Sequence, residues 1–259
     1  MVVRELWTGL LKWPAPVWRL RGYANAPVGH CRFKLVRSRI TPVPNYFELR
    51  NGTYEPEVLR FLGSHLSAGK IFVDVGAWIG LYLLLGSDLV RPDGKVYAFE
   101  PETESRKLLQ RNLKANHATN VIVGHYALSN KSGQLLMDAR PMSSLARICS
   151  NEEAPRHGLV KVEATTLDAF FKAKSEQPDI VKIDVEGHED RVVEGGEHTL
   201  RNRQTAVVIE LHSELLKRFG VNPGTFIHKV EVMRGQAATF LDMNRSVPGM
   251  PTHVAFERE

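Results

Sequence analysis

The hydrophobic positions of the chain fall into short, unbroken apolar runs that alternate with amphipathic stretches. The runs have strand length and are rich in β-branched residues; they lie at residues 70–75, 95–99, 120–125, 179–184 and 206–211. Helical periodicity fills three of the intervals, at residues 81–89, 102–116 and 186–202. Strands that are apolar on both faces and alternate with helices indicate a parallel sheet covered on both sides. The predicted fold class is therefore α/β, a doubly wound, Rossmann-like sheet.

Two further features interrupt this alternation. Residues 237–242 and 253–257 are separated by a turn-rich stretch and predict a terminal hairpin, hence an antiparallel edge strand. The interval between the third and fourth strands is longer than a crossover needs, and residues 134–138 and 160–164 within it are expected to pair. This insertion, about residues 134–164 with a connection at 141–155, is either a substrate loop or a packed edge hairpin.

Charge divides the chain into two parts. The net charge is +5, yet residues 1–40 hold eight basic side chains against Glu5 alone, and the remaining residues sum to −2. Three of the four tryptophans, Trp7, Trp13 and Trp18, lie in the same basic segment. We interpret residues 1–45 as a basic arm and residues 46–259 as the main domain. Basic residues mixed with aromatic ones suit an anionic membrane surface, and the alternative is a helix packed on the domain.

Several protein classes are excluded by composition. Lys12, Pro14 and Pro16 break the only apolar stretch near the N-terminus, so no export signal is predicted. The apolar stretch at residues 71–90 contains two aspartates and three glycines, which favours globular core over a membrane span. Two cysteines without paired spacing predict neither a zinc site nor a disulfide framework, and this fits a reducing cytoplasm.

The loop after the first strand, residues 74–80, has the pattern D-x-G-x-x-x-G. It lacks the G-x-G-x-x-G spacing of dinucleotide sites and the G-K-[ST] of phosphate loops. S-adenosylmethionine fits better, because Asp74 can meet its cationic amino group. Glu100 ends the second strand, where an acidic side chain can accept hydrogen bonds from two ribose hydroxyls.

Longer motifs add a family resemblance. The relevant stretches are G-T-Y-E-P at residues 52–56, the loop at 72–80, V-Y-A-F-E-P at 96–101 and K-I-D-V-E-G-H-E at 182–189. On these motifs the region from Gly52 to His212 resembles the FkbM-type methyltransferases. The resemblance implies a seven-stranded, class I methyltransferase fold, an S-adenosylmethionine cofactor and methylation of a hydroxyl on a sugar, glycolipid or secondary metabolite.

The resemblance also implies roles for individual residues around the cofactor. They are Asp74, Gly76, Ala77, Trp78 and Gly80 at the methionine end, Glu100 at the ribose, Ala127 at the adenine edge, Glu55 closing from the N-terminal side, and Asp184 facing the methyl group. Two positions depart from the family pattern. Trp78 stands where Asn is usual and Leu83 where a hydroxyl residue is frequent, which implies either weaker binding or an indole that covers the cofactor.

Candidate catalytic residues follow the fourth and fifth strands. Asp184 is followed by His188, and Glu210 and His212 share one side of the fifth strand because side chains alternate with period two. Methyl transfer needs alignment of the acceptor and removal of its proton, so His188 or His212 is the preferred general base, with Asp184 as the alternative.

Alternatives to this reading remain. Asp184, Glu210 and His212 could hold Mg²⁺, although plain ion pairs are favoured over a metal. The N-P-P-Y motif of base-directed enzymes is absent after Asp184, which argues against base methylation. RNA 2′-O-methylation or RNA binding through the basic arm is less favoured, as is a non-catalytic, membrane-peripheral module that binds the cofactor.

Overall fold

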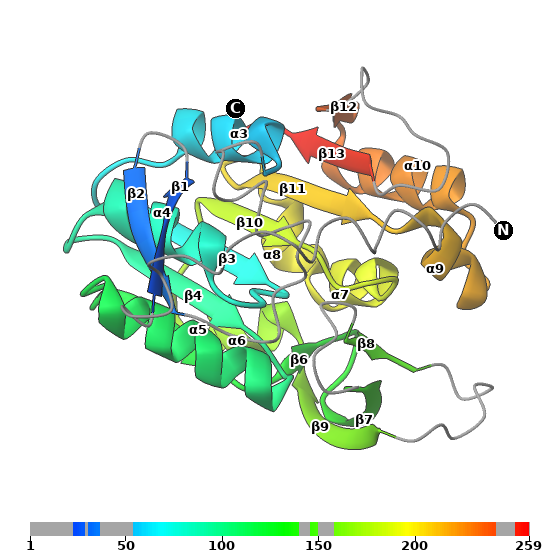
Figure 1. Cartoon of the computed structure of the whole chain (residues 1–259). Helices are drawn as coiled ribbons and strands as arrows, with labels where there is room; N and C mark the ends of the chain where they lie inside the picture. The colour runs from blue at the N-terminus through cyan, green and yellow to red at the C-terminus, as the bar shows by residue number, and fades with distance from the viewer. Residues whose placement is uncertain are drawn as a thin grey trace, which may run out of the picture.

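The structure is a computed structural model that describes residues 23–28, 31–36, 54–139, 146–149, 158–241 and 252–258. Its centre is a seven-stranded sheet with the order β12-β13-β11-β10-β3-β4-β5 (Figure 1). Five neighbouring strands are parallel: β3 (Ile71–Val75), β4 (Lys95–Phe99), β5 (Val121–Gly124), β10 (Ile180–Ile183) and β11 (Ala206–Leu211). These are the five strands that the apolar runs predict, so the predicted fold class is confirmed.

The C-terminal pair completes the sheet. β12 (Thr239–Phe240) and β13 (Thr252–Phe256) are antiparallel, and β13 is also antiparallel to β11. The antiparallel strand therefore lies one position in from the edge, with β12 outermost. This register places His253 opposite Glu210. A residue of the C-terminal strand β13 thus lies at the carboxyl end of β11.

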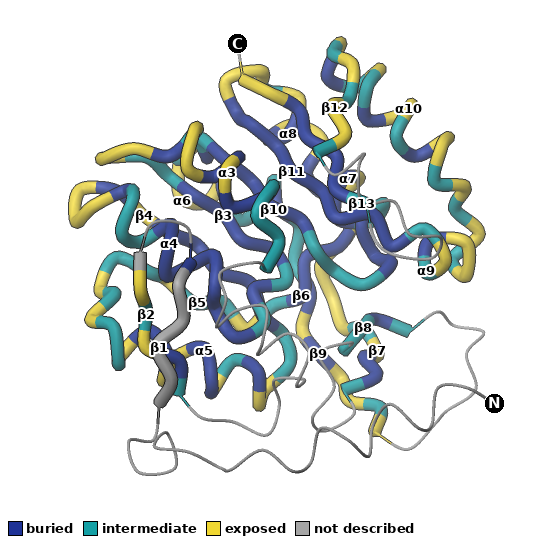
Figure 2. Tube along the Cα trace, turned by 45° about the horizontal axis from the view of Figure 1, so that its top comes forward, coloured by how far each residue is buried: buried dark blue, intermediate teal, exposed yellow. Residues whose placement is uncertain are grey.

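Alternation along each strand divides the core between two faces. α3 (Pro56–His65), α4 (Leu81–Val90) and α5 (Thr103–Ala115) share one apolar cluster with Phe72. α6 (Leu167–Lys174), α9 (Ser213–Arg218) and α10 (Pro223–Arg234) cover the other face, where they share a cluster with Val73 and Val75. Figure 2 shows the strands between these layers as a largely buried centre. Burial on both faces explains why the strands have no polar side in the sequence.

One predicted helix is divided. The periodicity at residues 186–202 predicts a single helix, but the structure has α7 (Glu189–Gly195) and α8 (Glu197–Arg201). The break lies at Gly196, directly after Gly195, the last residue of α7. A Cβ atom at Gly195 would lie 1.9 Å from the backbone oxygen of Ser129, so the glycine permits a close backbone approach that the hydrophobic pattern does not reveal.

The insertion forms a separate small sheet with the order β6-β9-β7-β8. Its strands are β6 (Ala127–Leu128), β7 (Gly133–Asp138), β8 (Arg147–Ile148) and β9 (Leu159–Thr165). β7 and β9 pair antiparallel, as predicted, while most of the connection at 141–155 lies outside the described residues. Because β6 follows the carboxyl end of β5, this sheet stands on the side of the main sheet where ligands bind in such folds (Figure 1).

Part of the predicted arm is a hairpin of β1 (Tyr23–Val28) and β2 (Cys31–Val36). The side chain of Asn116, the C-cap residue of α5, accepts from the backbone N of Lys34 and donates to its carbonyl oxygen, both at 2.7 Å. Val28 and Leu35 belong to the core cluster of that face. The hairpin is thus docked on α5, whereas residues 1–22 lie outside the described part. No described helix has the length and apolar character needed to cross a membrane.

Candidate active site

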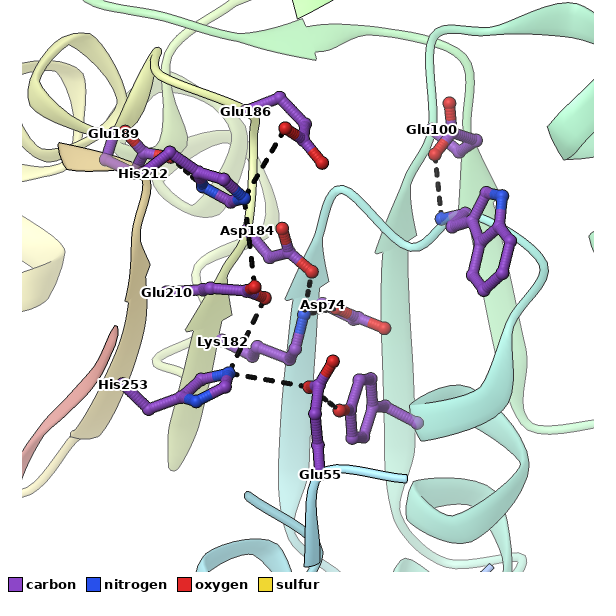
Figure 3. Close-up of polar contacts among 12 residues, drawn as sticks. Glu55, Asp74, Glu100, Lys182, Asp184, Glu186, Glu189, Glu210, His212 and His253 are labelled. Atoms are coloured by element: carbon purple, nitrogen blue, oxygen red, sulfur yellow. Dashed lines mark hydrogen bonds and ion pairs between the residues drawn. The ribbon is translucent and has the colours of Figure 1, made fainter. Parts of the chain in front are cut away.

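Charged side chains from three neighbouring strands converge at the carboxyl end of the sheet (Figure 3). Lys182 lies beside Asp74 in the β10–β3 register, so both side chains project from the same face. Its Nζ atom is 2.8 Å from Asp184 Oδ2, 3.7 Å from Asp74 Oδ1 and 4.6 Å from the centre of the Tyr82 ring. Burial opposes the charge of Lys182, but the two aspartates raise its pKa overall. The buried lysine links the first loop to the end of β10.

Asp74 is fully buried, and neither carboxylate oxygen has a hydrogen-bond partner among the described residues. Burial raises the pKa of Asp74 to about 7 in spite of the nearby Lys182 charge. A buried carboxylate without donors is costly, and a cationic ligand beside it would supply them. The position of Asp74 therefore fits an ammonium group, as the sequence predicts.

The loop between β3 and α4 has a left-handed backbone at three positions. Gly76, Trp78 and Gly80 have φ values of 84°, 45° and 85°. A Cβ atom at Gly76 would lie 1.7 Å from the backbone oxygen of Asp184, so the loop touches the end of β10 without an intervening side chain. The chain thereby holds the predicted cofactor loop against the first candidate catalytic residue.

Glu100 fixes the same loop from the end of β4. Its Oε2 accepts from Trp78 N and its Oε1 from Glu102 N, both at 2.8 Å. Burial raises the pKa of Glu100 to about 8, against the lowering effect of these two bonds. Each oxygen keeps one lone pair for a further donor. The backbone N of Glu100 donates to Gly124 O at 3.2 Å, so the turn that leads to the buried Ala127 lies beside it.

The two departures from the family pattern have different surroundings. Leu83 is fully buried in the apolar cluster of α4, where it acts as a core residue. Trp78 is partly buried against the same cluster, and its Nε1 has no partner among the described residues.

Glu55 stands at the start of α3 in a left-handed conformation with φ of 38°. It accepts a hydrogen bond from the Tyr82 hydroxyl, and its Oε2 lies 3.5 Å from His253 Nε2. Burial opposes ionisation, but the contact with His253 lowers the pKa of Glu55 overall. The N-terminal side of the site is therefore joined to the C-terminal strand.

His212 lies at the centre of the acidic part of the site. Its Nδ1–H donates to Glu189 Oε1 at 2.8 Å, while its Nε2 lies 3.4 Å from Glu186 Oε2 and 3.7 Å from Glu210 Oε1. Burial alone would lower the pKa of His212, but the bond to Glu189 and the neighbouring carboxylates raise it to about 10. The neighbouring carboxylates therefore favour the protonated form of the ring.

Glu210 is shared between two histidines. Its Oε1 faces His212, and its Oε2 lies 3.5 Å from His253 Nε2. Burial and the charge of Asp184 raise the pKa of Glu210. Within the described residues two sets of metal-ligating atoms lie within 4.8 Å of one another, one of Asp184, Glu210 and His212 and one of Glu55, Glu210 and His253.

His188 is not brought into this cluster. It is buried, its Nε2 lies 3.0 Å from Ser129 Oγ, and its ring packs edge-on against Phe219 at 5.9 Å. Burial lowers the pKa of His188 to about 4, helped by the charge of Arg191. The left-handed Glu186 and Gly187, with φ values of 52° and 97°, turn the chain between Asp184 and His188.

Sequence reasoning assigned no role to Glu189 or His253. Glu189 is part of the K-I-D-V-E-G-H-E motif, but its full burial and its bond to His212 depend on the fold. His253 meets Glu210 only through the β11–β13 register. The signal available in the sequence was a histidine at the start of a predicted strand, which does not specify a partner.

The FkbM methyltransferase domain model matches residues 74–243 of the chain. Among curated proteins, the hexuronic acid methyltransferase AglP of Haloferax volcanii is 26% identical over 216 residues, which are 80% of this chain and 84% of that protein.

Solved methyltransferases share the fold. A methyltransferase FkbM from Methylobacillus flagellatus KT is 15% identical with a TM-score of 0.50; the match covers 84% of this chain and 56% of that chain. The chain thus spans little more than half the length of that structure. An rRNA methylase of Clostridium thermocellum, described as putative, matches with a TM-score of 0.51 and 10% identity, over 76% of this chain and 91% of that chain. At these identities the likeness concerns the fold alone.

Proposed function

Because the chain belongs to the FkbM methyltransferase domain family and is an S-adenosylmethionine-dependent methyltransferase, we propose that it methylates a hydroxyl oxygen of a sugar or glycan. The observation that carries the proposal is the direct contact between the loop at Gly76 and the charged cluster that begins at Asp184. Carboxylates and imidazoles suit a hydroxyl-rich acceptor, because they exchange several hydrogen bonds with it. The likeness to a hexuronic acid methyltransferase supports the same acceptor class.

The cofactor residues have complementary roles in this proposal. Asp74 faces the ammonium group, Gly76 lets the backbone of the loop approach Asp184, and Glu100 offers its remaining lone pairs to the ribose hydroxyls. Ala127 borders the adenine, and Glu55 covers the cofactor from the N-terminal side. S-adenosylmethionine would supply a methyl carbon on a sulfonium centre; the acceptor oxygen would attack this carbon in line, with the thioether sulfur as the leaving group.

The cluster aligns the acceptor and removes its proton. Asp184, Glu210 and His212 hold the hydroxyl group near the methyl position, and proximity of this kind supplies much of the acceleration. We assign proton acceptance to Glu186, because its carboxylate is partly exposed and lies beside the residues that hold the hydroxyl group, with Oε2 3.4 Å from His212 Nε2. His188 has no role in proton transfer, since it faces Ser129 instead.

Mass spectrometry with a methyl-labelled cofactor tests the proposal on three acceptors: a neutral glycan, a hexuronic acid glycan and RNA. We expect label on a sugar oxygen of a glycan. Glu186→Gln should lower kcat with little change in cofactor affinity, and His188→Ala should keep turnover. Label on RNA alone would reject the acceptor class, and full activity of Glu186→Gln would reject the proton acceptor.

We also propose that residues 1–40 hold the enzyme at an anionic membrane surface, near a lipid-linked acceptor. The support is the excess of basic side chains in this segment and its three tryptophans. Because residues 23–36 include the docked hairpin, the variant that tests this proposal removes residues 1–22 only. The whole chain should float with anionic but not neutral liposomes, and the shortened chain, which loses all three tryptophans of the segment, should float less. Absence of flotation of the whole chain with anionic liposomes would refute the proposal.

A further inference from the structure

We propose that Asp184, Glu210 and His212 bind one divalent transition-metal ion, such as Mn²⁺ or Zn²⁺. The ion's catalytic use rests on the proposed function, but its binding does not, so the two are tested separately. The three residues come from the ends of β10 and β11, beside the loop that is expected to hold the cofactor. Their ligand atoms lie within 4.8 Å of one another.

The separation between His212 Nε2 and Glu210 Oε1, two of the three proposed ligand atoms, is too long for a hydrogen bond and close to that of two ligands of one ion. Their distance of 3.7 Å exceeds the usual range of N–H···O bonds. Two donors that each lie about 2.0–2.2 Å from one ion are separated by roughly 3.0–3.6 Å. The imidazole nitrogen and the carboxylate oxygens therefore surround a point at which a cation would contact them after small side-chain movements.

The imidazole is oriented as in metal sites. Its Nδ1–H donates to Glu189 Oε1, which also accepts from Gly187 N at 2.9 Å. Glu189 is fully buried, so this carboxylate is fixed by the fold. A metal-ligating histidine usually donates its second ring N–H to such a group, which sets the tautomer and directs the other nitrogen to the ion. Here the directed nitrogen is Nε2, which faces the carboxylates.

Charge favours a cation at this position. The site gathers six carboxylates against one lysine, Lys182, and two imidazoles that are cationic only when protonated; the carboxylates are those of Glu55, Asp74, Asp184, Glu186, Glu189 and Glu210. When the imidazoles are neutral, as metal binding requires, the negative excess is large and mostly shielded from water. A divalent ion would offset part of it.

The donor set also selects the ion. Mg²⁺ prefers oxygen ligands and keeps its waters, whereas a set of one imidazole and two carboxylates suits Mn²⁺ or Zn²⁺. Once bound, such an ion would lower the pKa of a coordinated acceptor hydroxyl. Glu186, adjacent to His212 Nε2, would then lie beside that hydroxyl.

Titration of the full-length, EDTA-treated protein tests the site without any turnover. We use three salts as probes. Binding of MnCl₂ is followed by electron paramagnetic resonance, and binding of ZnCl₂ and MgCl₂ is followed by calorimetry. We expect one Mn²⁺ or Zn²⁺ per chain and at least tenfold weaker binding of Mg²⁺. Absence of Mn²⁺ and Zn²⁺ binding at millimolar concentration would overturn the proposal.

Variants locate the ion. His212→Ala and the isosteric Glu210→Gln should each weaken Mn²⁺ binding at least tenfold, and Glu189→Gln should weaken it about tenfold to a hundredfold. Glu163→Gln is the matched control, because Glu163 forms an exposed pair with His125 at 3.1 Å away from the cluster. Circular dichroism checks that each variant folds. Unchanged Mn²⁺ affinity in folded His212→Ala and Glu210→Gln would place any bound ion elsewhere and refute the assignment.

The proposed function has its own readout. Full methyl transfer by metal-free protein would refute the metal's catalytic use and leave the O-methyltransferase proposal intact. Metal binding without methyl transfer to any glycan acceptor would refute the proposed O-methylation of a glycan and leave the metal site intact.

Discussion

Gly76 joins the cofactor loop to the charged cluster, and its replacement by alanine tests that junction directly. The residue has a φ of 84°, and an added Cβ would lie 1.7 Å from the backbone oxygen of Asp184. Gly69 is a matched control, because its φ is 82° and a Cβ there would meet nothing within 4 Å. Both substitutions introduce a methyl group into a left-handed backbone, and only Gly76→Ala adds a collision.

The two contributions are separable. A left-handed alanine costs about 1–2 kcal/mol, and this applies to both variants. Cβ contacts under 3.0 Å essentially never occur, so the 1.7 Å contact at Gly76 must lengthen by at least about 1.3 Å. Such overpacking adds about 1–3 kcal/mol. We therefore expect Gly76→Ala to lose about 2–5 kcal/mol of unfolding free energy and Gly69→Ala about 1–2 kcal/mol.

Urea denaturation measures the loss of unfolding free energy, and the rise in Tm with S-adenosylmethionine measures cofactor binding. Movement of the loop away from Asp184 should remove most of the cofactor-induced rise in Gly76→Ala and none of it in Gly69→Ala. The reasoning would be refuted if the two variants lost equal stability and bound the cofactor as tightly as the unmodified protein.

Three further substitutions test other parts of the molecule. His188 has a pKa of about 4 when folded and about 6.5 when unfolded, so the unfolded chain binds the proton first and stability falls as pH drops between these values, by up to about 3 kcal/mol. Urea titrations between pH 4 and pH 6.5 should show this loss of unfolding free energy. The His188→Gln variant should lack the part that His188 causes, whereas the control His228→Gln, at an exposed position, should show the full loss. Glu100→Ala should abolish most of the Tm rise caused by S-adenosylmethionine, whereas Glu104→Ala, at an exposed ion pair on α5, should leave it unchanged. Asn116→Ala removes two hydrogen bonds to Lys34 and should cost about 1–3 kcal/mol, with faster amide exchange of Lys34; unchanged exchange would contradict the docking role.

The strands were predictable because each is a local apolar run, and burial on both faces of a parallel sheet requires that pattern. The positions of Asp74, Gly76 and Glu100 at the ends of β3 and β4 were predictable for a related reason. Chemistry at the carboxyl ends of parallel strands is marked by polar and glycine residues directly after an apolar run. The prediction of a single helix at residues 186–202 was wrong. The glycine at position 195 permits a close contact with the backbone of Ser129, and a hydrophobic pattern does not reveal such a contact.

The histidines show where sequence reasoning stops. Both histidines follow a predicted strand, yet His188 packs against Ser129 and Phe219, whereas His212 lies among three carboxylates. His212 directly follows β11, but the left-handed turn at Glu186 and Gly187 lies between β10 and His188.

The sequence by itself determined the α/β class, the five parallel strands, the loop beside Asp74 and the acidic residues at the strand ends, because these depend on neighbours along the chain. The tertiary structure alone decided that Glu189 orients His212, that His253 meets Glu210 and that Lys182 stands between Asp74 and Asp184. Those contacts join residues that are distant in sequence or set by register, and the charges they bring together fix the protonation of the site through burial and mutual distance.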